Sequence, residues 1–313
     1  MQHRTLGILC AALLVPVGVA ARTLKNGPIE TVAHHLQRTD GLELIRSHAE
    51  ASPGPMAHVA ITPTQIVVDG KPLIPLQTGP SGATIAANQT KGFLLPKLYE
   101  ELSAIAEYRM AIGRRLDGLL IGDPFLFNGK LALTIDRRVP FSTVRSVMYT
   151  AGQAQFSEFH FIVDNPYLSS LTAIESRLPG FGLPWIDPAD EARCRPLNLT
   201  VFVTPHGLNI AGDVPPGTPT SLPCAAGTCG GVDAYPWDAF NNTLAALKDH
   251  SPHSRKVTVV PHSAVSIEVL AKAIDYARWA PMVPLDSSEA TWHEWQRTRT
   301  PMFDTPVFTG GSP

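Results

Sequence analysis

The sequence has almost no excess of charge of either sign. Its 25 Lys and Arg residues nearly balance 27 Asp and Glu residues, so the formal net charge at pH 7 is −2. A general nucleic-acid binder or a polybasic membrane-surface protein carries a clear positive excess. The charge balance argues against both classes, and we expect no nucleic-acid partner.

Charged residues are also few, at 17%, while hydrophobic residues make up 44%. This composition excludes a wholly disordered chain. A length of 313 residues favours about two domains. The 29 Pro and 24 Gly residues predict long irregular connections between their elements.

Long uncharged apolar runs are absent except at the N-terminus, where Leu6–Ala21 follows Arg4 and ends in small residues. These are the parts of a secretory signal. Sixteen residues of helix rise about 24 Å, less than the roughly 30 Å hydrocarbon core of a bilayer. Residues 1–21 are therefore predicted to be a signal peptide, with an uncleaved N-terminal anchor as the alternative.

Cysteine is scarce, with four residues in the chain. Cleavage of the signal leaves Cys194, Cys224 and Cys229, of which the last two close a small loop in a Pro- and Gly-rich stretch. In an oxidising compartment this spacing favours a Cys224–Cys229 disulfide, although pairing with Cys194 stays open. Zinc would need more ligands nearby, so no metal site is predicted.

Familiar catalytic motifs are missing too. The sequence contains no Gly-x-Ser-x-Gly elbow, no His-Glu-x-x-His pair and no phosphate-binding Gly-x-x-x-x-Gly-Lys-Ser/Thr loop. The Gly79–Thr84 stretch is expected to be a flexible connection, and the histidines at 34–35 and 250–253 to be solvated. We expect a protein that is not an enzyme and has no cofactor.

What the sequence does contain is an internal repeat. The segment His58–Gly70 resembles Thr200–Gly212, with the pairs Val59/Val201, Thr62/Thr204, Pro63/Pro205 and Gly70/Gly212 identical. The segment Lys130–Ala151 aligns without a gap to Lys256–Ala277. The two pairs follow one another in the same order, which indicates two copies of one unit.

Each copy is predicted to contain the same elements. A β-run broken by Thr-Pro suggests a hairpin-like edge, because proline cannot donate within a central ladder. Apolar periodicity predicts helices over 97–115 and 237–248, and further helices starting near Ser142 and Ser266. Strands are expected at 131–135, 159–163, 257–260 and 302–308. The predicted fold class is α+β: two tandem small sandwiches, each a mixed sheet with two helices on one face.

This pattern resembles the periplasmic domain of the ExbD/TolR biopolymer-transport family, present twice. The resemblance rests on a strand followed by Asp136, the turn Val139-Pro140-Phe141, and a helix ending near Tyr149-Thr150-Ala151-Gly152. In the second copy, His262 occupies the acidic turn position, the helix IEVLAKAIDYAR is the better match, and Phe303–Thr309 resembles the closing strand.

The resemblance implies an envelope component that binds partners in proton-gradient-coupled transport or envelope maintenance. Such proteins accompany a multi-spanning proton-channel subunit of the ExbB/TolQ type. The family's transmembrane segment carries an essential Asp, whereas Leu6–Ala21 has no acidic residue, so we expect this chain not to carry the proton itself. The expected location is the periplasm, or the inner membrane facing it, and a dimer is a further expectation.

The expected domain boundaries follow from the repeat. Residues 22–55 are predicted to be a tether, 56–165 the first ExbD/TolR-like domain, 166–194 a linker and 195–313 the second domain. Trp237 and Trp279 are expected to be core anchors of the second copy.

Partner binding is predicted at the sheet edges. The candidate residues are Val59 and Ile61 in the first copy, and Val201 and Val203 in the second, where an extended partner peptide would add as a strand. Asp136, in a charged turn, is a further candidate, with a solvated turn as the alternative. Two other functions remain open: an exported hydrolase with an unrecognised site, and a structural periplasmic scaffold.

Overall fold

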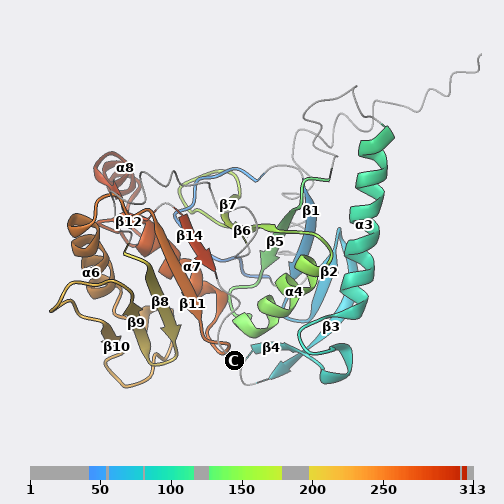
Figure 1. The fold of residues 1–313 in the computed structure, drawn as a ribbon, viewed down its shortest axis with the longest axis horizontal. Coiled ribbons are helices and arrows are strands. Elements are labelled where there is room, and N and C mark those ends of the chain that lie inside the picture. The colour runs from blue at the N-terminus through green and yellow to red at the C-terminus, as the bar shows by residue number, and fades with distance from the viewer. Residues whose placement is uncertain are drawn as a thin grey trace, which may run out of the picture.

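The computed structural model describes residues 42–53, 56–79, 82–115, 127–177, 197–303 and 305–308. Within them the chain forms a seven-stranded mixed sheet, a five-stranded mixed sheet and a small two-stranded ribbon, together with α-helices (Figure 1). The predicted α+β class is confirmed. The expected signal or anchor at 1–21 lies outside the described residues.

The first sheet has the order β4-β3-β2-β1-β5-β6-β7. Strands β1, β5 and β6 are parallel neighbours, and the other pairings are antiparallel. Its strands are β1 (Ala57–Ile61), β2 (Gln65–Val68), β3 (Lys71–Gly79), β4 (Gly82–Ile85), β5 (Lys130–Ile135), β6 (Glu158–Val163) and β7 (Thr172–Arg177). The first half also contains η1 (Ala87–Gln89), α3 (Pro96–Arg115) and α4 (Phe141–Gln153).

The second sheet has the order β10-β9-β8-β11-β14, and β8, β11 and β14 run parallel. Its strands are β8 (Leu199–Thr204), β9 (Gly207–Ala211), β10 (Ser221–Pro223), β11 (Lys256–Pro261) and β14 (Thr305–Phe308). The other elements are η2 (Val232–Ala234), α6 (Trp237–His250), α7 (Ile267–Arg278), β12 (Trp279–Ala280), α8 (Glu289–Thr298) and β13 (Thr300–Pro301). The helices predicted from periodicity are confirmed.

The two halves share one strand register. Val59 is paired with Val68 and Leu133 in the first sheet, and Val201 is paired with Ile210 and Val259 in the second. These partners are the ones that the sequence alignment matches. Turn hydrogen bonds repeat as well, because the Thr62 hydroxyl donates to the Gln65 carbonyl at 3.0 Å and the Thr204 hydroxyl to the Gly207 carbonyl at 3.0 Å.

Helices cover one face of each sheet. In the first half, Leu98 of α3 and Val144 of α4 share a core cluster with inward-facing strand residues such as Leu133. In the second half, Leu244 of α6 and Leu270 of α7 pack in the same way, and the cluster continues through both halves. Burial of each such side chain contributes about 1.5–3 kcal/mol. The sheets meet where β14 lies beside β7 (Figure 1).

Equivalent turns of the two halves bind each other. The Phe141 amide donates to the Val265 carbonyl at 2.8 Å, and the Ile267 amide donates to the Val139 carbonyl at 3.1 Å. Between them, Pro140 and Ser266 form an antiparallel bridge. Each bond therefore satisfies the first free N–H of one helix with a carbonyl from the other half. The helices expected to start near Ser142 and Ser266 begin at Phe141 and Ile267, and neither has a side-chain cap bond.

Two expected connections differ from the structure. The described part of the expected tether, residues 42–53, includes a buried strap, which we define as residues 42–51. Leu42, Ile45 and Ser47 of this strap are at most 1% exposed. The expected linker at 166–194 is wrong at its start, because Thr172–Arg177 forms strand β7; residues 178–194 lie outside the described residues.

Candidate functional site

The strand residues predicted to bind partners are interior. Val59, Ile61, Val201 and Val203 are all fully buried. Strand β1 is paired on both sides, by β2 and β5, and β8 is paired by β9 and β11. Hairpin strands β2 and β9 are also covered, by β3 and β10. The prediction of strand addition at these residues is wrong, because their backbone groups already have ladder partners.

Asp136 is likewise an internal residue. Its side chain is 1% exposed, and its carboxylate accepts hydrogen bonds from the Glu43 amide at 2.9 Å and from the Arg138 amide at 3.0 Å. The Arg138 guanidinium adds two bonds of 2.8 Å. Burial raises the Asp136 pKa, but the hydrogen bonds from Arg138 and the amides outweigh it, so the pKa is lowered overall. Both earlier interpretations, partner contact and solvated turn, are wrong: Asp136 holds the strap against the turn.

Charged side chains continue this contact across the junction of the halves. The Arg137 Nε donates to the Glu43 carboxylate of the strap at 2.6 Å, and its Nη1 donates to the Glu268 carboxylate of α7 at 3.2 Å. One partly exposed guanidinium thus joins the strap, the first-half turn and the start of the second-half helix. Because these groups are solvated, the net stabilisation is about 0–1 kcal/mol per pair.

A second anchor of the strap is buried. The Ser47 hydroxyl donates to the Asp275 carboxylate at 2.9 Å, and the His48 amide donates to the same carboxylate at 2.8 Å. The His48 ring stacks on Trp292, with 5.4 Å between ring centroids, and lies 5.0 Å from Trp295. These contacts fix the first-half strap to α7 and α8 of the second half.

Ser47, His48 and Asp275 are the residue types of a hydrolase triad, but their arrangement differs. The Ser47 hydroxyl bonds directly to Asp275 and accepts the Ala49 amide at 3.1 Å. Within the described structure no hydrogen bond joins Ser47 to His48, and Ser47 is fully buried. A triad requires an accessible serine whose proton passes to histidine. This cluster therefore has the geometry of a structural anchor.

A pocket of about 230 Å³ opens beside the strap. It is lined by His48, Ala49, Glu50, Ala51, Arg278, Trp279 and Pro301. The Glu50 carboxylate accepts two bonds from the Arg299 guanidinium, at 2.9 and 3.0 Å, and Arg299 lies 4.0 Å from the centre of the Trp279 ring. Burial raises the Glu50 pKa, but bonds from Arg299 and Gln296 lower it overall. The pocket is smaller than most small-molecule sites, which measure about 300–1,000 Å³.

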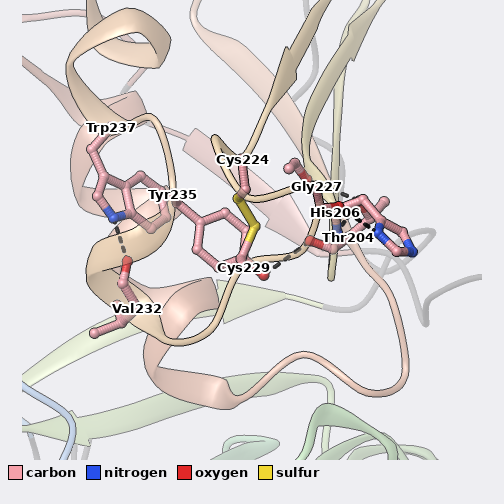
Figure 2. Close-up of a disulfide and its surroundings, with 9 residues drawn as sticks. Thr204, His206, Cys224, Gly227, Cys229, Val232, Tyr235 and Trp237 are labelled. Carbon is pink, nitrogen blue, oxygen red and sulfur yellow. Dashed lines mark hydrogen bonds between the residues drawn. A yellow bond between two sulfur atoms is a disulfide. The ribbon is translucent and has the colours of Figure 1, made fainter.

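The predicted disulfide between Cys224 and Cys229 is confirmed, with 5.4 Å between the Cα atoms. Figure 2 shows the bridged loop against the turn between β8 and β9. The Cys224 amide donates to the His206 carbonyl at 2.9 Å, and the Cys229 amide donates to the Pro205 carbonyl at 2.7 Å. The bridged loop therefore fixes the turn between β8 and β9.

Two aromatic residues near the start of α6 make further hydrogen bonds beside this loop. The Tyr235 hydroxyl donates to the Thr204 carbonyl at 2.9 Å, and the Trp237 indole donates to the Val232 carbonyl at 2.6 Å (Figure 2). The Tyr235 and Trp237 rings stack with 5.3 Å between centroids. Trp237 is a buried anchor as predicted, whereas Trp279 is only partly buried and lines the pocket.

Two kinds of feature are absent from the described residues. They contain no group of three or more His, Cys, Asp or Glu residues arranged to hold a metal ion. They also contain no helix with the length and apolarity needed to cross a bilayer. His34 and His35 lie outside the described residues.

Sequence reasoning missed the strap and its aromatic partners. Two signals were present: the apolar group Leu42, Leu44 and Ile45, and the spacing of Trp292 and Trp295 three positions apart on one helix face. Comparison with known protein families, curated proteins and solved structures finds no match to this chain.

Proposed function

We propose that this protein is an exported bacterial envelope component with two tandem ExbD/TolR-like units, which acts by binding partners in proton-gradient-coupled transport or envelope maintenance. It does not carry the proton itself. The observation that carries the proposal is the reciprocal pairing of the two equivalent turns, Val139–Phe141 and Val265–Ile267. It adds to the resemblance of each half to the family.

Reciprocal pairing is the mark of an isologous contact, in which the same patch of two units binds its own counterpart. Here both patches belong to one chain, so two binding units are held at a fixed mutual geometry without a second subunit. A partner complex would receive a pre-assembled pair, and the entropy cost of bringing two units together would already be met by the chain.

The disulfide supports the envelope location. Such bonds persist in oxidising compartments and are rare in the bacterial cytosol. The Cys224–Cys229 bridge fits the export signal expected at residues 1–21. We propose a periplasmic location, either free or anchored at the inner membrane.

Of the two alternatives, the hydrolase has less support. Ser47, His48 and Asp275 do cluster, but the serine lies buried against the aspartate without a bond to the histidine. A purely structural scaffold would use the same fixed junction without a channel partner, so the pull-down below separates it from the proposed function.

The test is a pull-down of the full chain, tagged at its C-terminus, from gently solubilised envelopes of the native host. We expect recovery of a multi-spanning subunit of the proton-channel type, identified by mass spectrometry. An untagged strain serves as the control, and N-terminal sequencing of the recovered chain shows whether residues 1–21 remain. Recovery of the chain without any such subunit would overturn the proposed function.

A further inference from the structure

The outer faces of the two sheets, which point away from the helices, are covered differently. In the first half, Ala60 and Val67 lie on this face, and Leu42 and Leu44 of the strap pack over them. All four side chains are at most 6% exposed. The strap is held there by the Glu43 carbonyl, which accepts the Arg137 amide at 2.8 Å, and by the bond from the Glu43 amide to Asp136.

The equivalent face of the second sheet is partly exposed in the described structure. Ala60 is paired with Val67 in the first hairpin, and Phe202 is paired with Asn209 at the same register position of the second. Phe202 is 37% exposed and Asn209 is partly exposed. We define the outer face of the second sheet as Thr200, Phe202, Thr204, Asn209, Lys256, Thr258 and Val260, all of them at least partly exposed.

The two sheets also differ in the residue that lies beside an equivalent lysine. Lys130 at the start of β5 forms an ion pair of 2.9 Å with Glu158, its register neighbour on β6. Lys256 holds the equivalent position on β11, but its register neighbour on β14 is Thr305. Lys256 is exposed. At this described register position the second half therefore has a threonine where the first half has an acidic residue.

We propose that the outer face of the second sheet binds an extended segment of a partner protein, with apolar side chains at alternating positions and a carboxylate that reaches Lys256. The apolar positions are inferred from the first half, where Leu42 and Leu44 cover the same face, and the carboxylate from the ion pair between Lys130 and Glu158. An extended segment places every second side chain on the sheet, which matches the row formed by Thr200, Phe202 and Thr204. The inference rests on the proposed function and identifies the surface that performs it.

The test uses the purified full chain and a fluorescein-labelled peptide with the sequence of residues 42–50, measured by fluorescence anisotropy. We expect saturable binding, and a loss of affinity of at least about tenfold for Phe202→Ala, because this variant removes the exposed aromatic ring on which the peptide's leucines would pack. Lys256→Glu should weaken binding as well. Tyr108→Ser, at a position that is 69% exposed on α3, is the matched surface control and should retain wild-type affinity.

A second variant, Thr258→Arg, guards against a folding effect at Phe202, because it blocks the face without removing any buried group. It should also lose binding, and circular dichroism should show both variants folded. A peptide with serine in place of both leucines should not bind. Absence of saturable binding, or equal affinity of wild type, Phe202→Ala and Thr258→Arg, overturns the proposal. So does protection of Phe202 from hydroxyl radicals in the free chain, because the chain would then cover the face itself.

The envelope pull-down separates this inference from the proposed function. Recovery of the channel subunit by wild type and Phe202→Ala alike would leave the proposed function standing and overturn this surface. Peptide binding that depends on Phe202, without any channel subunit in the pull-down, would support the surface and overturn the proposed function.

Discussion

Phe141 donates its backbone amide to the carbonyl oxygen of Val265 at 2.8 Å, and thereby joins the start of a first-half helix to the second half. The reverse bond, from Ile267 to Val139, occupies the equivalent position at 3.1 Å. Amides in the first turn of a helix have no partner within the helix. The two halves therefore meet through two helix-start amides, which in an isolated half would have only water as a hydrogen-bond partner.

This junction can be tested by comparing Ile267→Pro with Ile267→Ala. Both variants lose the buried side chain, but only proline removes the amide that donates to Val139. Proline is tolerated at the first helical position, and Ser266 before it already has an extended backbone with φ −69° and ψ 153°. We expect the proline variant to be less stable than the alanine variant by about 1–2 kcal/mol in urea unfolding. Equal stabilities would mean that the bond contributes nothing.

Asp136 and His262 offer a second comparison, because they hold equivalent turn positions. Asp136→Ala leaves the Glu43 and Arg138 amides without their acceptor and should cost about 3 kcal/mol. His262→Ala removes an exposed ring whose Nδ1 accepts only the Ala264 amide at 3.2 Å, and should change stability by less than about 0.5 kcal/mol. Chemical unfolding measures the free energy of unfolding of both variants. A large loss of stability in His262→Ala but not in Asp136→Ala would contradict the structural role assigned to Asp136.

Local sequence patterns predicted the helices well, because their signal lies within one segment. The apolar period over 97–115 matches α3, which spans Pro96–Arg115. The repeat alignment also matched the observed registers, since Val59 and Val201 have equivalent partners.

The position of a strand within its sheet could not be predicted in the same way. Strand β1 is not an edge because β5, which lies far along the chain, pairs with its other side. The proline suggested an edge strand, but it lies in the turn between β1 and β2 and not within either strand. The strap was missed because its burial depends on Asp275 and on Trp292, more than two hundred positions away. Asp136 was read as a surface group because one of its two amide donors, Glu43, lies in that strap.

The disulfide gives a third prediction. The Cys224–Cys229 bridge closes a short loop, so the chain-entropy contribution is small, about 2 kcal/mol. The double variant Cys224→Ala with Cys229→Ala should lose about this much in urea unfolding, and a reducing agent should produce a similar loss in the wild type.

The double variant is also the control for the reducing agent, which should not affect it further. Equal stability of the oxidised wild type and the double variant would show that the bridge does not stabilise the fold, and that the loop is held by its bonds to Pro205 and His206 alone.

The final prediction concerns the pH dependence of stability at His58. This residue is 3% exposed, and its Nε2 lies 2.7 Å from the Thr134 hydroxyl. Burial lowers its pKa from 6.5 to about 4.

Between pH 6.5 and about pH 4 the unfolded chain takes up a proton at His58 and the folded chain does not, so the free energy of unfolding must fall as the pH is lowered through this window. The contribution is present in full above about pH 6.5, and about 3 kcal/mol of it is lost by about pH 4. His58→Gln keeps a hydrogen-bonding group for Thr134 but cannot titrate, so its free energy of unfolding should decline less steeply over the same range. His206→Gln, at an exposed histidine of the turn between β8 and β9, is the control for the replacement of histidine by glutamine. Urea unfolding at several pH values between about 7 and 4 measures all three slopes. If wild type and His58→Gln give parallel curves, the acid sensitivity of the fold arises elsewhere, and the neutral buried state assigned to His58 is wrong.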